Sequence, residues 1–350
     1  MKSLFSLLIV LLCHTVTGQQ SGNDYTEKDI QRYKNKPNYI VTDRSQLLAA
    51  LEEAAPYSII YVKGNAQIDL SGEKNIIIKE GIKLIGDRKK NKKELGAVLF
   101  TSNAGVHPFF KVDGDNVLIY GVTIVGDDGN VLVKDDSFEE KKQVDVKNSY
   151  MELYHNNMYA TPVSSGVATQ MRNLVIDNCE LSQWTYTAVY VRKGAENIQI
   201  KNSYIHHNQR FGLGYGITID QGEAIITNNV FNYNRHSIAS TGREGSRYTV
   251  EGNLFCKDGN NTWAIDMHGG KDWNDGTNIA GDYAIVRDNV FYITGKGQAF
   301  VIRGKSLKKS IITGNVVYKD KMSLISAARV FEQVNAKGNL EIKDNKVKLK

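Results

Sequence analysis

The stretch IDMHGG, residues 265–270, places an acid and a histidine where both could take part in chemistry. Successive side chains of a β-strand alternate between its two faces, so if Ile265 and Met267 point into a core, Asp266 and His268 both face outward. A histidine exchanges protons near neutral pH. We expect Asp266 not to contact His268 directly, but to orient a neighbouring ring nitrogen, a metal ion or a sugar hydroxyl. The stretch therefore predicts a proton-transfer centre on the outside of a sheet.

Four other segments have a similar pattern and extend this centre into two columns. The expected strands lie within 188–194, 216–222, 237–242, 264–270 and 299–305. The last outward position of each gives the column Arg192, Asp220, Thr241, His268 and Arg303. The outward position before it gives Tyr190, Thr218, Ala239, Asp266 and Val301. Stacked strands would space the members ~4.8 Å apart, close to the length of one sugar ring. The columns predict an exposed polysaccharide-binding groove.

The turns beside these strands are rich in residues that bind anions or transfer protons. Cleavage of an acidic sugar polymer by β-elimination needs a cation on the carboxylate, a base for the neighbouring proton and an acid for the leaving oxygen. We assign catalysis to His268, Arg303, Arg243, His236 and Tyr215. We assign substrate binding to Arg192, Tyr190, His206, Arg210, Asp220, Arg235, Asp266 and Lys305. Glycines around this set are expected to keep the backbone low and the cleft open.

The strands belong to a repeat that runs from Val175 toward the C-terminus. Its core carries a small or amide side chain between apolar residues, at Cys179, Ser203, Asn229, Asn253, Asn289, Asn315 and Asn345. A period of roughly 25 residues, built of short β-type runs with little helical periodicity, indicates a parallel solenoid. The inward asparagines are expected to hydrogen-bond the backbone of the turns above and below.

The first half of the chain has the same short β-branched runs, preceded by one predicted helix. Residues 43–55 are typical of a capping helix that begins at Asp43 and ends at Pro56. This helix is expected to cover the open end of the solenoid. The sequence thus predicts one all-β domain over 39–350, after a linker at 19–38, with an irregular surface excursion over about 129–168.

The capping helix, the stretches IIYVKG (59–64) and GIKLIGD (81–87), and the repeated I-x-x-N-x-F pattern together resemble the pectate-lyase-like superfamily. The resemblance implies a right-handed parallel β-helix from about Tyr39 to the C-terminus. It is specific for fold rather than reaction, because that superfamily includes lyases, hydrolases, esterases, epimerases and phage adhesins.

The expected function is that of a secreted polysaccharide lyase that cleaves a uronate polymer by β-elimination. A polygalacturonase-like hydrolase ranks second, because MHGG (267–270) and IRGK (302–305) resemble two motifs of those hydrolases while their paired aspartates are missing. A non-catalytic polysaccharide-binding β-helix and a uronan epimerase stay open. Many lyases of the superfamily bind calcium, and here the calcium ligands would be Asp220, Asp266 and Asp272; no other cofactor is expected.

The N-terminus and the net charge bear on location and partners. Residues 1–18 combine a lysine, an apolar run and small residues, which is typical of a secretory signal peptide. Cys13 lacks the small residues expected before a lipidated cysteine, so we predict a secreted or periplasmic protein without a lipid anchor or membrane span. The net charge of +6 is not clustered in blocks, which argues against nucleic-acid binding and suits an acidic polysaccharide. We expect a monomer.

Overall fold

The computed structural model describes residues 25–89, 95–128, 162–210, 212–257, 263–293, 298–319, 334–343 and 346–349. The chain divides into two compact units, residues 1–36 and 37–350. The first unit contains α2 (Glu27–Asn35), inside the segment that we predicted to be a linker. Its Thr26 and Asp29 form a reciprocal capping box, a signal that the sequence analysis overlooked. The predicted signal peptide lies outside the described residues.

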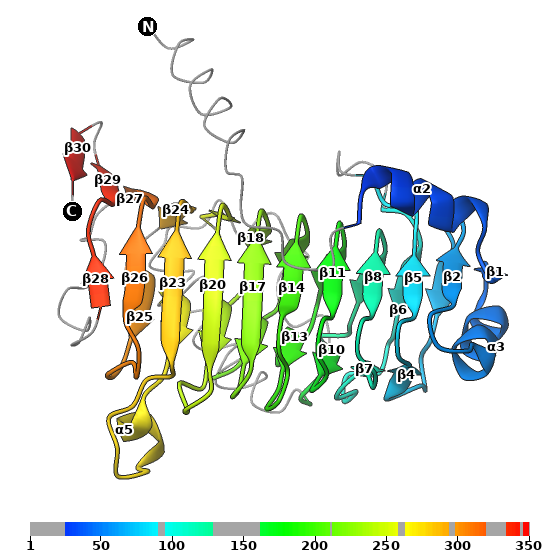
Figure 1. Ribbon diagram of the computed structural model, residues 1–350, viewed down its shortest axis with the longest axis horizontal. Coiled ribbons are helices and arrows are strands. Elements are labelled where there is room, and N and C mark those ends of the chain that lie inside the picture. The colour runs from blue at the N-terminus through cyan, green and yellow to red at the C-terminus, as the bar shows by residue number, and fades with distance from the viewer. Residues whose placement is uncertain are drawn as a thin grey trace, which may run out of the picture. The chain divides into compact units, whose positions relative to one another are not determined.

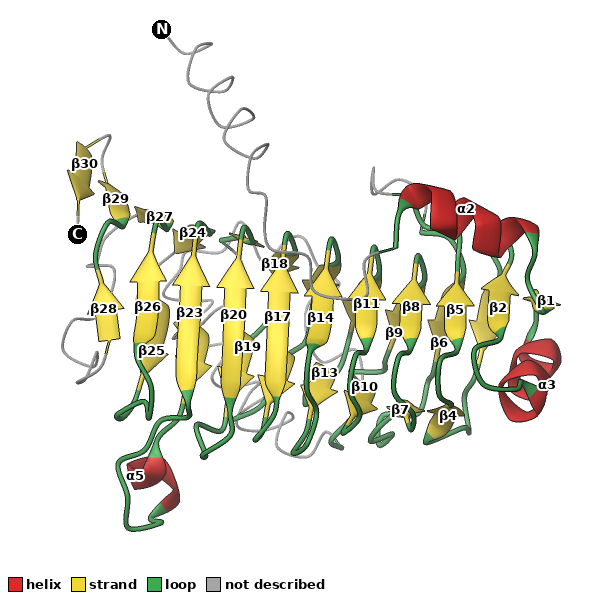
Figure 2. Ribbon diagram, viewed as in Figure 1, coloured by secondary structure: helices red, strands yellow, loops and turns green. Residues whose placement is uncertain are grey.

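The described residues of the second unit form three parallel β-sheets wound as a solenoid (Figures 1 and 2). From Ile59 to Ile302, each coil adds one strand to sheet A, then one to sheet B, then one to sheet C. Sheet A contains, in spatial order, β1 (Tyr39–Val41), β2 (Ile59–Val62), β5 (Lys83–Ile85), β8 (Leu118–Tyr120), β11 (Val175–Asp177), β14 (Ile198–Lys201), β17 (Glu223–Thr227), β20 (Arg247–Glu251), β23 (Tyr283–Arg287), β26 (Ser310–Thr313) and β28 (Val334–Ala336).

Sheets B and C follow the same order of coils. Sheet B contains β3 (Gln67–Asp69), β6 (Val98–Phe100), β9 (Thr123–Val125), β12 (Glu180–Ser182), β15 (Tyr204–His206), β18 (Val230–Asn232), β21 (Leu254–Phe255), β24 (Val290–Ile293), β27 (Val316–Lys319), β29 (Leu340–Lys343) and the antiparallel β30 (Lys346–Leu349). Sheet C contains β4 (Ile76–Ile78), β7 (Phe110–Val112), β10 (Ser165–Thr169), β13 (Thr187–Val191), β16 (Tyr215–Ile219), β19 (His236–Ser240), β22 (Trp263–Met267) and β25 (Gln298–Ile302).

The core is a stack of inward apolar side chains, one set per coil. In sheet C, the buried residues Val189, Ile217, Ile238, Ile265 and Phe300 are partners in register on successive strands. Their alternation with outward positions is the pattern from which the sequence analysis placed the two columns.

A ladder of buried asparagines runs along the corner between sheets A and B. The backbone N–H of Asn229 donates to Asn253 Oδ1 at 2.9 Å, and that of Asn253 donates to Asn289 Oδ1 at 2.9 Å. The predicted stacking is therefore present. The rung after Asn315 is Asn339, whose Oδ1 accepts from Asn315 N at 3.1 Å; Asn345, which we predicted as a member of the ladder, lies outside the described residues. Asn339 takes this place because it directly precedes β29, the next strand of sheet B.

The predicted capping helix is α3 (Arg44–Glu53), whose N-cap Asp43 accepts a hydrogen bond from Gln46 N at 2.9 Å. It packs on β1, β2 and β4 at one end of the solenoid (Figure 1). Its buried residues Leu47, Ala50 and Leu51 belong to the core. The predicted excursion ends earlier than expected, because β10 already belongs to sheet C; residues 129–161 lie outside the described part. No helix within the described residues is long and apolar enough to cross a bilayer.

Candidate functional site on the outer face of sheet C

The predicted column from Tyr190 to Val301 is a continuous row of register partners on the outside of sheet C. Tyr190 pairs with Thr218, Thr218 with Ala239, Ala239 with Asp266, and Asp266 with Val301. Each of these residues alternates with an inward core residue on its own strand. Tyr190 is half-buried, whereas Thr218, Ala239, Asp266 and Val301 are buried, so the expected exposed groove is not open along this row.

The second predicted column follows the same register just beyond the strand ends. His268 N donates to Ser240 O, the carbonyl before Thr241, at 3.0 Å. Arg303 N donates in the same way to Met267 O, the carbonyl before His268, at 2.9 Å. Arg192 and Asp220 occupy the equivalent positions of earlier coils, where their N–H groups donate to Thr169 O and Val191 O. Arg192 is exposed, whereas Asp220, His268 and Arg303 are half-buried.

Asp266 is the centre of a charged cluster and is wholly buried, although it faces outward. Arg303 Nε donates to its Oδ1 at 2.9 Å, and Nη2 donates to Oδ2. The Nε2 atoms of His236 and His268 each lie 3.6 Å from Oδ2. The expectation of a solvent-facing carboxylate without a His268 contact is wrong, because side chains of three coils close over it.

Burial shifts the protonation of every ring and carboxyl in this cluster. It raises the pKa of Asp266, against the opposing charges of His268 and Arg303. It lowers the pKa of His268, although Asp266 acts in the other direction, and lowers that of His236 well below its ordinary value. Burial also raises the pKa of Tyr215. Both imidazoles are therefore neutral near neutral pH, and Tyr215 is a protonated phenol.

One wall of the site is a row of aromatic rings at the start of the sheet C strands. Tyr215 stacks on His236 with centroids 5.6 Å apart, and His236 stacks on Trp263 at 6.1 Å. Tyr186 meets Tyr215 edge-on at 5.9 Å, and Arg235 lies over Tyr215 at 5.8 Å. Tyr186, which directly precedes β13, was not among the residues predicted from the sequence, because it belongs to neither column.

The other wall is built by the strand-end column and the short helix α5 (Gly270–Trp273). Trp273 Nε1 donates to Thr241 O at 2.7 Å, and Arg243 lies over the indole at 4.9 Å. Gly242 has φ +65°, and a Cβ there would lie 1.7 Å from His268 O. This close approach of two coils requires glycine at 242.

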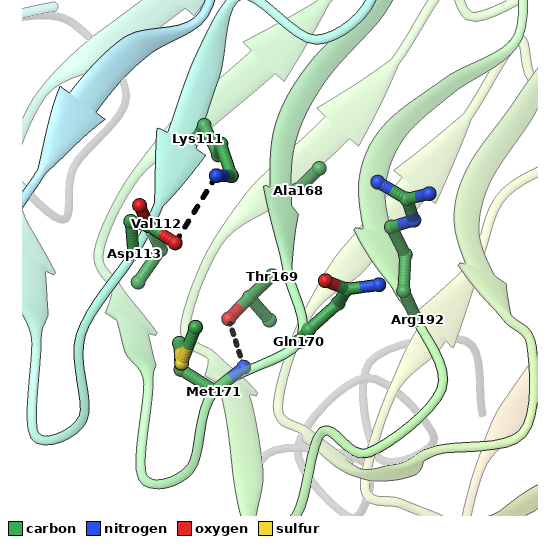
Figure 3. Close-up of a pocket in the computed structure, with 8 residues that line it drawn as sticks. All are labelled: Lys111, Val112, Asp113, Ala168, Thr169, Gln170, Met171 and Arg192. Carbon is green, nitrogen blue, oxygen red and sulfur yellow. Dashed lines mark hydrogen bonds and ion pairs between the residues drawn. The ribbon is translucent and has the colours of Figure 1, made fainter.

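The face continues toward the N-terminal coils as a shallow hollow, drawn in Figure 3. It is lined by Lys111, Val112, Asp113, Ala168, Thr169, Gln170, Met171 and Arg192. Lys111 pairs with Asp113 at 3.1 Å, while the Arg192 guanidinium packs over the Tyr190 ring at 5.4 Å. Arg192 thus presents a cation to solvent ~14 Å, or three strand spacings, from the coil of His268.

Three predicted binding residues lie apart from the cluster. His206 is in β15 of sheet B, where Nε2 lies 3.1 Å from Glu180 Oε1, so its assignment to this face is wrong. The chain turns from sheet B to sheet C only after His206, which the sequence spacing did not reveal. Arg210 lies in that turn, bridged to Leu213. Lys305 follows β25 and is exposed.

The three aspartates named as calcium ligands do not form a joint site. Asp266 is paired with Arg303, and Asp220 Oδ1 accepts from Thr241 Oγ1 at 2.8 Å. Asp272 lies near His268 and Arg303. Within the described ranges no group of three or more His, Cys, Asp or Glu side chains is arranged to hold a metal ion.

Known structures share this architecture at low sequence identity. The alginate lyase from Paenibacillus sp. str. FPU-7 has a TM-score of 0.57 and 18% identity, over 86% of this chain and 94% of that one. The thermostable pectate lyase PL 47 has a TM-score of 0.50 and 14% identity, over 89% and 81%. The family 28 exopolygalacturonase of Yersinia enterocolitica has a TM-score of 0.50 and 14% identity, over 88% and 65%. These likenesses show the fold.

No curated protein matches the chain in sequence. The sequence model described as "Right handed beta helix region" matches residues 58–255, more than half of the 350 residues. The right-handed parallel β-helix that the resemblance implied is thereby confirmed, and the chain belongs to the right-handed β-helix family.

Proposed function

We propose that the protein is a polysaccharide lyase that cleaves a uronate polymer by β-elimination on the outer face of sheet C. The observation that carries the proposal is that His268, whose pKa burial lowers, and the Arg243 guanidinium both contact the Trp273 ring, at 5.5 and 4.9 Å from its centroid. Base and carboxylate receptor are the two groups that elimination needs next to each other. The alginate and pectate lyases with the same fold act, by their names, on uronate polymers.

In the proposed reaction His268 is the base. Its Nδ1 is buried without a hydrogen bond, 3.3 Å from Asp272 Oδ2, and its Nε2 lies 3.6 Å from Asp266 Oδ2. In the proposed step the imidazole takes the proton from the carbon next to the carboxylate, and the released electron pair forms the ring double bond as the glycosidic C–O bond breaks. Tyr215, as a protonated phenol, is the proposed acid for the leaving oxygen.

Asp266 and Arg303 act in this proposal through His268. Asp266 is fully buried and Arg303 uses both Nε and Nη2 on it, so neither is placed to meet a substrate first. Together they fix the imidazole from below. In this proposal Arg243 and Arg235 bind the substrate carboxylate, and Arg192 binds a sugar further along the polysaccharide.

A hydrolase is the second candidate function, because Asp266 is buried. Inversion by two carboxyl groups needs both to reach the substrate, at ~6.5–9.5 Å separation. Asp220 and Asp266 stand two coils apart, and Asp266 is covered. An epimerase would use the same base and cation, so the products must decide.

The test is incubation of the purified protein with polygalacturonate, polymannuronate and polyglucuronate. A lyase raises the ultraviolet absorbance of an unsaturated uronate and creates reducing ends at the same rate. Reducing ends without that absorbance would mean that the protein is a hydrolase. An altered sugar configuration without cleavage would mean that it is an epimerase, and an unchanged polymer would mean that it only binds polysaccharide. On the sequence of residues 1–18 we also propose that the protein is exported; N-terminal sequencing of the secreted form tests this.

A further inference from the structure

Trp273 contacts both the proposed base and a cation. Its centroid lies 5.5 Å from that of His268, with the rings tilted by 38°, and 4.9 Å from the Arg243 guanidinium carbon. Its Nε1 donates to the carbonyl oxygen of Thr241, the residue before Gly242, which closely approaches His268 O. One side chain therefore sets the relative place of two groups from different coils.

Arg243 differs from Arg303 and Arg235 in how its N–H groups are used. A guanidinium that stacks through its face keeps its N–H edge for an anion. Arg303 spends Nε and Nη2 on Asp266, and Arg235 directs Nη1 to the Tyr215 hydroxyl at 3.4 Å. Among the described residues, Arg243 is exposed and its charge is not consumed by an ion pair.

The residue before Trp273 ties the same turn to the base. Asp272 lies 3.3 Å from His268 Nδ1 and 3.5 Å from Arg303 Nη1, and it accepts from Gly269 N at 3.2 Å. The α5 turn thus touches the base, its supporting arginine and the free arginine. A short helix that only closed a loop would not need these three contacts.

We propose that Trp273 is a positioning residue that holds Arg243 as a receptor for one uronate carboxylate, at a fixed distance from His268. The inference takes its substrate class from the proposed function. Trp273 then acts on affinity through Arg243 and on proton transfer through His268.

A double-mutant cycle tests the link to Arg243. Binding of saturated trigalacturonate and trimannuronate is measured by calorimetry, in a His268→Ala background that prevents turnover. We expect Arg243→Ala and Trp273→Ala each to weaken binding about ten- to a hundredfold, the range for losing a charge-assisted hydrogen-bonded pair. The double variant should bind no more weakly than Arg243→Ala alone, and Trp273→Phe should bind nearly as the parent does. The control is Arg287→Ala, an exposed arginine of sheet A.

Two further readouts separate positioning from simple folding. Trimer binding should change the fluorescence of Trp273 in the parent and not in Arg243→Ala, where the indole is intact. In the active protein, Trp273→Ala should move the acid limb of the kcat profile to higher pH, because His268 loses part of its burial, while Trp273→Phe restores the limb.

Multiplicative losses in the double variant, or unchanged affinity in Trp273→Ala, would overturn the inference, as would trimers that fail to bind the parent. The outcome is independent of the reaction assignment. If the trimers bind with the expected coupling and the wild type forms no unsaturated product, positioning stands and elimination fails.

Discussion

The asparagine ladder and the strand-end column of sheet C use the same geometry for opposite purposes. Each takes one residue per coil at ~4.8 Å spacing. The ladder repeats one side chain, buried and bonded to the next coil, as at Asn253 and Asn289. The column changes at every coil, from Arg192 to Asp220 to His268. Repetition inside holds the coils in register, and that register lets unlike residues outside be placed next to each other.

The largest effect is expected from Asp266→Ala. Asp266 faces outward from sheet C, yet it is as buried as a residue of the asparagine ladder. Removing it leaves Arg303 without its counter-charge, which should lower the free energy of unfolding by about 3–5 kcal/mol and abolish turnover. Chemical denaturation and the elimination assay measure both. Asp220→Ala is the matched control, since that half-buried carboxylate should cost less than about 1 kcal/mol. An equal loss of unfolding free energy in Asp266→Ala and Asp220→Ala would contradict the role of Asp266 as the centre of the buried cluster.

A ladder residue should affect stability alone. Asn253→Ala removes the acceptor of Asn229 N and the donor to Ile226 O, which should cost about 1–3 kcal/mol. Turnover per folded molecule should stay that of the wild type. Thr249→Ala, on the outer face of β20, is the reference and should change little. Loss of turnover at equal folded fraction would mean that the ladder also shapes the site.

The fold was predictable and the site only in outline, for the same physical reason. Register follows from local alternation and from turn residues such as Gly269 and Asn229, which the sequence displays directly. Burial of Asp266 depends on side chains from neighbouring coils, and so does the stacking of Trp273 on Arg243. His206 was misplaced because a corner between sheets separates it from Tyr215, and residue spacing does not mark corners.

Acidification should lower the free energy of unfolding, because the imidazoles of His236 and His268 stay neutral in the folded protein. Burial lowers the folded pKa of His236 and His268, so the unfolded chain binds more protons below its ordinary value of 6.5. Stability should therefore be complete above that pH and fall as pH drops toward the folded pKa values, by at most about 1.4 kcal/mol per pH unit and group. Urea titrations at stepped pH measure the slope. A flat profile between neutral pH and pH 5 would contradict neutral, buried imidazoles.

The smallest effect is expected at the far end of the column. Arg192→Ala should leave stability within about 0.5 kcal/mol of the wild type, because the side chain is exposed and stacks on the Tyr190 ring. It should raise KM for long oligouronates and leave KM for dimers unchanged, since its coil lies ~14 Å from that of His268. The dependence of KM on oligomer length is the measurement. An equal change for dimers would place the reaction nearer to Arg192.

The central claim is that His268 on sheet C transfers the proton, and one paired comparison tests it. His268→Ala and His206→Ala both remove a half-buried histidine with a carboxylate neighbour, one on each sheet. We predict that the rate of unsaturated uronate formation falls about a hundred- to ten-thousandfold in His268→Ala and stays near wild type in His206→Ala, with both variants folded. A folded His268→Ala variant that retains the wild-type rate would contradict the account.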